Sequence, residues 1–258
     1  MNTAKRTGQP TIGFDRRIRL TWLGATAAES AQGLSPGAIR DKLESVLADE
    51  VVGSGVHNAR GKTKTILLHV WVLVPEHLEQ FRDDALHLFL GLDRAQQKAL
   101  HWGMLLATYP FFRDVATLVG RLIELQGTVA LSQLQRRVAE VWGERTTIQR
   151  AVPPVLKSMA DWGVLEETAR AHVYRSAPRI GQVSPAIREW LVEALYLARG
   201  DRVAPFQDLV HHPALFPFDL AISPASLYRH PRLEVVRLGL DQDVVTRREL
   251  QRHDEPVG

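Results

Sequence analysis

Apolar residues in the first half of the chain recur at the spacing of an α-helix. Ser35 is a suitable N-cap and Pro36 suits the first helical position, so a helix is expected to begin there and run to about Asp49. Pro75 should end or interrupt the helix before it, and Tyr109-Pro110 should separate two later ones. Helices are therefore expected over residues 36–49, 65–74, 76–90, 94–108 and 111–125.

Three stretches of this half depart from the helical pattern. Residues 1–12 are polar and basic and are expected to form a mobile arm. Residues 14–23 fit either a strand or a helix, because apolar residues alternate there with arginines. Residues 53–64 are glycine-rich and basic, which predicts a loop before the apolar helix that starts near residue 65.

The periodicity changes from Gly127 onward. Thr128-Val129 is β-prone, residues 132–142 form an amphipathic helix that Gly143 ends, and Thr146-Thr147 can cap a helix running to Trp162-Gly163. Two strand-like runs follow, 164–168 and 172–177. This order is typical of a winged helix-turn-helix.

The final third combines one clear helix with proline-spaced segments. Ser184-Pro185 begins a helix that Gly200 ends, and residues 233–240 and 244–245 can pair as strands. The expected fold class is mainly α. It comprises a helical N-terminal bundle (residues 1–120), a winged helix-turn-helix (121–178) and a small α+β C-terminal extension (179–258).

Composition narrows the class of protein. The 258 residues are 45% hydrophobic and 24% charged, which is typical of a folded globular chain. The chain has no cysteine, and this excludes disulfides, thiolate zinc sites and cysteine nucleophiles. The longest apolar run, Ile66 to Val74, is far shorter than the ~20 residues of a membrane span, and the basic N-terminus lacks the apolar region of a secretory signal. We therefore expect a cytoplasmic protein that does not engage a membrane.

The net charge is only +3, but the basic residues are 26 Arg against 6 Lys. One interpretation is codon bias in a GC-rich genome. The other is functional, because the arginine fork suits phosphates and guanine edges. Composition alone leaves both open.

The start of the second helix in the helix-turn-helix is the expected DNA-contacting segment. In this fold its N-terminal residues enter the major groove and the wing reaches an adjacent backbone. Arg can bind guanine, Gln can bind adenine, and Thr hydroxyls can hold phosphate. The candidates are Arg145, Thr146, Thr147, Gln149 and Arg150 on the helix, with Lys157, Arg170, His172 and Arg175 as phosphate contacts.

Pro153-Pro154 falls inside this helix, where each ring removes an amide donor. Either the helix is kinked after one turn, or it begins at Pro153. In the second case Gln149 and Arg150 would not point toward the groove.

Gly61-Lys62-Thr63 partly matches a phosphate-binding loop. The pattern requires glycine at position 56, which is Val56, whereas Gly55 is one residue early. A basic loop that contacts phosphates through Arg60, Lys62 and Lys64 is the simpler hypothesis.

The sequence shows no motif typical of a catalytic or cofactor-binding site. The ten histidines do not assemble into a ligand set, and hydrolase, kinase, Rossmann and zinc-protease signatures are absent. We predict no catalytic residue, no metal and no cofactor. Trp102, Trp142 and Trp162 lie on apolar helical faces and are expected in the core.

The segment from Tyr109 to Asp114, together with the helix to Leu125 and the run Asp161 to Leu165, resembles the BrxA family of the BREX bacteriophage-defence systems. The similarity spans about residues 14–177 and includes the helix opening at Gly33-Leu34-Ser35. It implies an N-terminal helical domain similar to the transcription factor NusB, joined to a winged helix that binds DNA without catalysis. It also implies other defence-system subunits as partners. The two prolines of the recognition helix and the long C-terminal extension depart from the family.

The sequence thus predicts a non-enzymatic protein that binds double-stranded DNA, and the resemblance alone implies that it is a component of a BREX-type antiviral defence system. A winged-helix transcriptional regulator is one alternative, and it would show a two-fold dimer and a pseudo-palindromic footprint. A protein-interaction scaffold without DNA binding is the other, with the winged helix covered by a partner.

Overall fold

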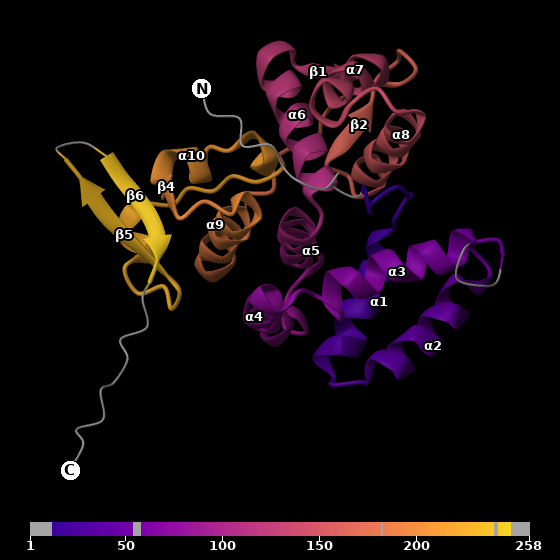
Figure 1. Ribbon diagram of the computed structural model, residues 1–258, viewed down its shortest axis with the longest axis horizontal. Helices are drawn as coiled ribbons and strands as arrows, with labels where there is room; N and C mark the ends of the chain where they lie inside the picture. The colour runs from indigo at the N-terminus through magenta and orange to yellow at the C-terminus, as the bar shows by residue number, and fades with distance from the viewer. Residues whose placement is uncertain (1–11, 54–57, 182, 240–241, 249–258) are drawn as a thin grey trace.

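The computed structural model describes residues 12–53, 58–181, 183–239 and 242–248, and it is mainly helical with two small antiparallel sheets (Figure 1). The expected N-terminal arm lies, apart from Ile12, outside the described residues. Residues 12–19 form an irregular segment that runs into a helix, which resolves the open choice at residues 14–23. The helices of the first half are α1 (Leu20–Ala31), α2 (Pro36–Ala48), α3 (Ala59–Trp71), α4 (Glu79–Phe89, preceded by the 3-10 turn η1, Glu76–Leu78), α5 (Arg94–Thr108) and α6 (Pro110–Gln126).

Helix α2 begins as its capping residues predict. The Ser35 hydroxyl accepts a hydrogen bond from the backbone N–H of Ala38, and Pro36 occupies the first helical position.

The expected loop over residues 53–64 is wrong for its second half, because α3 begins at Ala59 rather than near residue 65. The side chain of Asn58 accepts a hydrogen bond from the N–H of Gly61 and caps the helix. Gly61-Lys62-Thr63 is therefore helical, and its amides bond within the first turns instead of forming a phosphate cradle.

The middle third has the element order expected from the periodicity. It consists of β1 (Thr128–Ala130), α7 (Leu131–Trp142), α8 (Thr146–Asp161), β2 (Leu165–Glu167) and β3 (Val173–Ser176). The three short strands form an antiparallel sheet in the order β1-β3-β2. Gly143, with φ of 88°, ends α7 in a conformation that favours glycine. These elements lie together at one end of the molecule, beside α6 (Figure 1).

Helix α8 is continuous from Thr146 to Asp161, so the alternative in which it begins at Pro153 is wrong. Pro153 has no N–H to donate to the carbonyl of Gln149, one turn earlier. The side-chain amide of Gln135 on α7 donates to that carbonyl instead, at 2.9 Å. A neighbouring helix thus supplies the donor that the proline removes.

The C-terminal third packs against the first half. It contains α9 (Pro185–Arg199), β4 (Val203–Pro205), α10 (Phe206–Val210), the 3-10 turns η2 (Pro213–Leu215) and η3 (Pro224–Leu227), and the hairpin β5 (Leu233–Leu238) and β6 (Gln242–Arg247). The strand order is β4-β6-β5. The Ser184 cap and the left-handed Gly200 bound α9 as expected.

Two glycines allow this close packing. A Cβ at Gly103 on α5 would lie 2.8 Å from Cη2 of the Trp190 ring of α9 and closer still to Cζ3. One at Gly120 on α6 would lie 2.7 Å from the Pro213 carbonyl carbon of η2 and closer still to its oxygen. Both helices therefore require glycine, which has no side chain, where the C-terminal third contacts them.

A cluster of aromatic rings joins all three thirds of the chain. The buried Trp102 ring makes edge contacts with Phe112, Trp162 and Phe216, and its Nε1 donates to the carbonyl of Ala214. Trp142 and Trp162 are also buried, which confirms the expected role of these tryptophans in the core. One hydrophobic cluster includes residues from all three parts of the chain. The division into three domains stays a prediction.

Candidate nucleic-acid interface

The two faces of α8 differ sharply. Ile148, Val152, Val155 and other apolar residues are buried against the rest of the molecule. The opposite face carries, at helical spacing, the exposed or half-buried residues Thr146, Thr147, Arg150, Pro153, Pro154 and Lys157. Both prolines thus lie on the outer face, where the carbonyl of Arg150 that Pro154 leaves without a donor can bond to water.

The N-terminus of α8 is open to solvent. The N-cap position belongs to Arg145, which has extended backbone angles and no side-chain cap, so the expectation that Thr146 or Thr147 caps the helix is wrong. These two threonines are the first helical residues and are exposed. Their amides belong to the first turn, where N–H groups lack acceptors within the helix. The Arg145 guanidinium donates to the carbonyl of Trp142, at 3.4 Å.

Gln149 and Arg150 point in different directions. The Gln149 side chain is half-buried and its amide donates to the carbonyl of Gln135 on α7, at 3.5 Å. Arg150 is exposed, and its side chain has no ion pair within the described part of the chain. Of the two expected base-contacting residues, only Arg150 projects from the surface.

The turn between β2 and β3 has its own local order. The Thr168 hydroxyl donates to the carbonyl of Arg170 and accepts from its N–H, both at 3.2 Å. His172 has a φ of 62°, unusual for a non-glycine residue, and its N–H donates to the Glu167 carboxylate at 2.8 Å. Arg170 and His172 are exposed at this tip.

Arg175 on β3 is less available than Arg170. Its guanidinium pairs with the Glu166 carboxylate across the β2–β3 ladder, at 2.8 Å. Arg170 and Lys157 are exposed and have no ion pair with any residue that the structure describes. Arg150, Lys157 and Arg170 are therefore the candidate cations that the fold leaves for an outside partner.

The C-terminal end of α8 is fixed to the N-terminal segment. The Trp162 indole N–H donates to the carbonyl of Ile18 at 2.8 Å, and the N–H of Ile18 donates to the Ser158 hydroxyl at 2.9 Å. Arg17 pairs with Asp161 beside them. No local pattern in the sequence indicates this connection, because its partners are 140 or more residues apart and include backbone groups.

The second group of expected phosphate contacts lies on α3 and is engaged in the fold. Arg60 donates to Glu44 at 2.7 Å and to the carbonyls of Val51 and Ala48 at 3.0 and 2.9 Å, so it caps the end of α2. Lys64 pairs with the same Glu44, and hydrogen bonds from Lys64 and then Arg60 lower the pKa of that carboxyl. Only Lys62 of this group is exposed.

The segment Tyr109 to Asp114 has a structural role at the start of α6. Phe111 and Phe112 are buried, and the Arg113 guanidinium donates to the carbonyl of Ala198 on α9. The Asp114 carboxylate accepts from the Trp142 indole N–H at 3.0 Å. These residues connect α6 to α7 and α9, so the role that the structure shows for them is in packing.

Comparisons with known proteins add no identification: no family model, no curated protein and no solved structure matches the chain. Across the described ranges, no three His, Cys, Asp or Glu side chains are grouped so that they could hold a metal ion. In the same part of the chain, no helix combines the length and the apolar character needed to cross a membrane.

Proposed function

We propose that the protein binds double-stranded DNA through a winged helix-turn-helix formed by residues 121–178. The observation that carries the proposal is the succession of α6, β1, α7, α8, β2 and β3 with strand order β1-β3-β2, together with a solvent-facing stripe on α8. In this arrangement α8 is the recognition helix and the β2–β3 turn is the wing.

Each exposed cation has a separate task in this proposal. Arg150 lies one turn into α8 and can reach a guanine edge bidentately, while the first-turn amides at Thr146 and Thr147 can hold a phosphate. Lys157 and Arg170 contact the DNA backbone. Gln149 takes no part in base contact, because its amide is turned toward α7.

We also propose, from the resemblance, that the protein is a non-enzymatic component of a BREX-type defence system with other defence subunits as partners. Support comes from the layout that the resemblance implies, a helical N-terminal part followed by the proposed winged helix.

The test is a titration of random duplexes with the full chain at several salt concentrations. The two phosphates neutralised by Lys157 and Arg170 give a slope of log K against log salt of about −1.8, at about −0.9 each. No binding at low salt, or a slope near zero, would reject the proposal and favour the protein-interaction scaffold.

Variants then separate sequence preference from charge. Arg150→Ala should change the relative affinities for different duplexes, by about 1 to 3 kcal/mol at its preferred base. Arg170→Ala should weaken all duplexes alike and reduce the salt slope by about 1. Arg229→Ala, at an exposed arginine of the C-terminal third, is the matched control and should change neither quantity. Identical behaviour of the first two variants would discard Arg150 as a base contact.

A further inference from the structure

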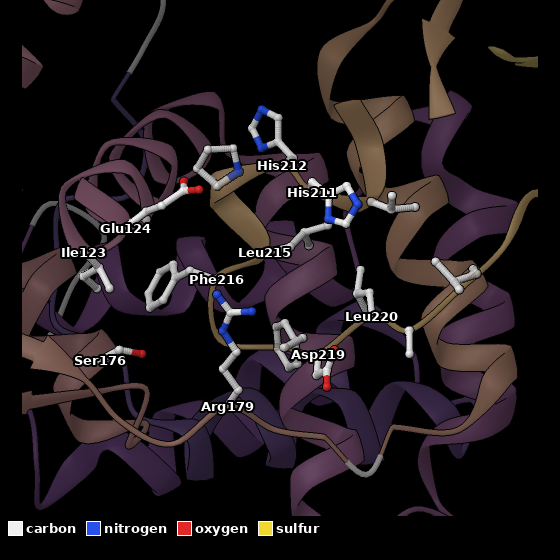
Figure 2. Close-up of a pocket in the computed structure, with 16 residues that line it drawn as sticks. Ile123, Glu124, Ser176, Arg179, His211, His212, Leu215, Phe216, Asp219 and Leu220 are labelled. Carbon is white, nitrogen blue, oxygen red and sulfur yellow. The ribbon is translucent and has the colours of Figure 1, made fainter. Parts of the chain in front are cut away.

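One pocket lies away from α8, between α6 and the C-terminal third. Its volume is about 460 Å³, within the range of ligand-binding pockets. One wall is the last turns of α6 with the segment after β3. The other is η2 and residues 218–222 (Figure 2).

The chemistry of the lining is uneven. The apolar part of the lining comes from Ile123, Leu215, Phe216, Phe218, Leu220 and Ile222, and polar groups make up a slightly larger part. The Arg179 side chain rises between these residues, and its guanidinium reaches into the middle of the pocket (Figure 2). Arg179 makes no hydrogen bond or ion pair through its side chain to any residue within the described ranges, although Glu124 and Asp219 also line the pocket.

The backbone around Arg179 is held in place. The N–H of Ile180 donates to the carbonyl of Pro217 at 2.8 Å, and the N–H of Asp219 donates to the carbonyl of Ile180 at 3.2 Å. These bonds form a short parallel bridge between Ile180 and Phe218. The guanidinium is thus carried by an ordered segment, which reduces the entropy lost when a ligand binds.

Two histidines line the pocket, and one of them, His212, carries no positive charge at neutral pH. Burial, and next the nearby Arg199, Arg121 and Arg113, lower the pKa of His212 to about 4. Its Nδ1 accepts a hydrogen bond from the N–H of Ala214, which also requires that this nitrogen carry no proton. Arg179 is the one arginine or lysine among the residues that line this pocket.

We propose that this pocket binds a small organic monocarboxylate with an apolar body. A guanidinium pairs with a carboxylate through two parallel hydrogen bonds, and the apolar wall accepts the remainder of the molecule. Glu124 and Asp219 oppose a second negative charge, so a dicarboxylate or a phosphate fits less well.

The test is isothermal titration of the full chain with hexanoate, decanoate and 3-phenylpropionate, and with the primary amide of each acid. We expect saturable binding of at least one acid at one site, and at least tenfold weaker binding of its amide. Arg179→Gln should weaken the acid tenfold or more, whereas Arg175→Gln, four residues earlier and paired with Glu166, should leave the affinity unchanged.

Three results would overturn the proposal of a carboxylate site, and a fourth would overturn the class of ligand. The first three are no saturable binding of any acid at 10 mM, equal affinity for acid and amide, or undiminished binding in Arg179→Gln with an unchanged circular dichroism spectrum. Tighter binding of inorganic phosphate or succinate than of any monocarboxylate would also reject the assigned class. The measurement contains no DNA, so its outcome is independent of the proposed DNA binding.

Discussion

The contact between Gln135 and the Gln149 carbonyl makes a prediction about how α8 tolerates proline. Pro153 leaves that carbonyl without its helical donor, and the Gln135 amide supplies one at 2.9 Å. Gln135→Met keeps an unbranched side chain of similar helix propensity but removes the donor. An acceptor left without a partner in a half-buried place should cost about 1 kcal/mol of folding stability, the low end of the usual penalty.

The second change restores the helical donor. Pro153→Ala returns an N–H to position 153, one turn after the Gln149 carbonyl, so the carbonyl no longer depends on α7. In this background Gln135→Met should cost close to nothing. The double-mutant cycle should therefore show a coupling energy of about 1 kcal/mol between two residues on different helices.

Urea unfolding followed by tryptophan fluorescence measures the four free energies. With a slope near 3 kcal/mol/M, the upper part of the usual range, 1 kcal/mol moves the midpoint by about 0.3 M. An equal effect of Gln135→Met in both backgrounds would show that the glutamine packs against α8 without replacing the missing donor. No effect in the natural chain would refute the reasoning altogether.

Three further predictions concern the packing and the pH dependence of stability. Trp162→Ala should cost about 3 to 5 kcal/mol, because the ring is buried and anchors α8, and an unchanged thermal midpoint would contradict this. Gly120→Ala should lower the midpoint because its Cβ would meet the Pro213 carbonyl, whereas Gly37→Ala, with open space around it on α2, should leave the midpoint unchanged or raise it. Burial lowers the pKa of His101 to about 3 from 6.5, so the folded state gains no proton there while the unfolded chain does. Stability should fall as pH drops from about 6.5 toward 3, and His101→Leu should flatten that loss in urea titrations.

Local signals in the sequence located most helix boundaries. Ser35 and Ser184 each precede a proline and accept a hydrogen bond from an N–H three residues later, so both starts depend only on neighbouring residues. Gly143 and Gly200 adopt positive φ and end helices for the same local reason. Where a helix boundary depends on such neighbouring residues, periodicity and capping patterns are sufficient to predict it from the sequence.

The start of α3 shows how a compositional argument can hide a local one. Glycines and basic residues suggested a loop, yet Asn58 is a good N-cap and the residues after it form a helix. The cap was readable in the sequence. The pairing of Arg60 and Lys64 with Glu44 on α2 was not.

The orientation of the candidate DNA-contacting residues depends on contacts that no local pattern contains. Arg150 and Gln149 are adjacent and both polar, but only Gln149 has a neighbouring helix within reach of its amide. The anchoring of α8 is harder still to predict from sequence. Trp162 and Ser158 bond to the backbone of Ile18, and any residue type has the same backbone groups. A hydrophobic pattern can therefore predict that α8 exists and which face is buried. The direction in which its outer face points is set by a segment about 140 residues earlier, and only the folded arrangement reveals it.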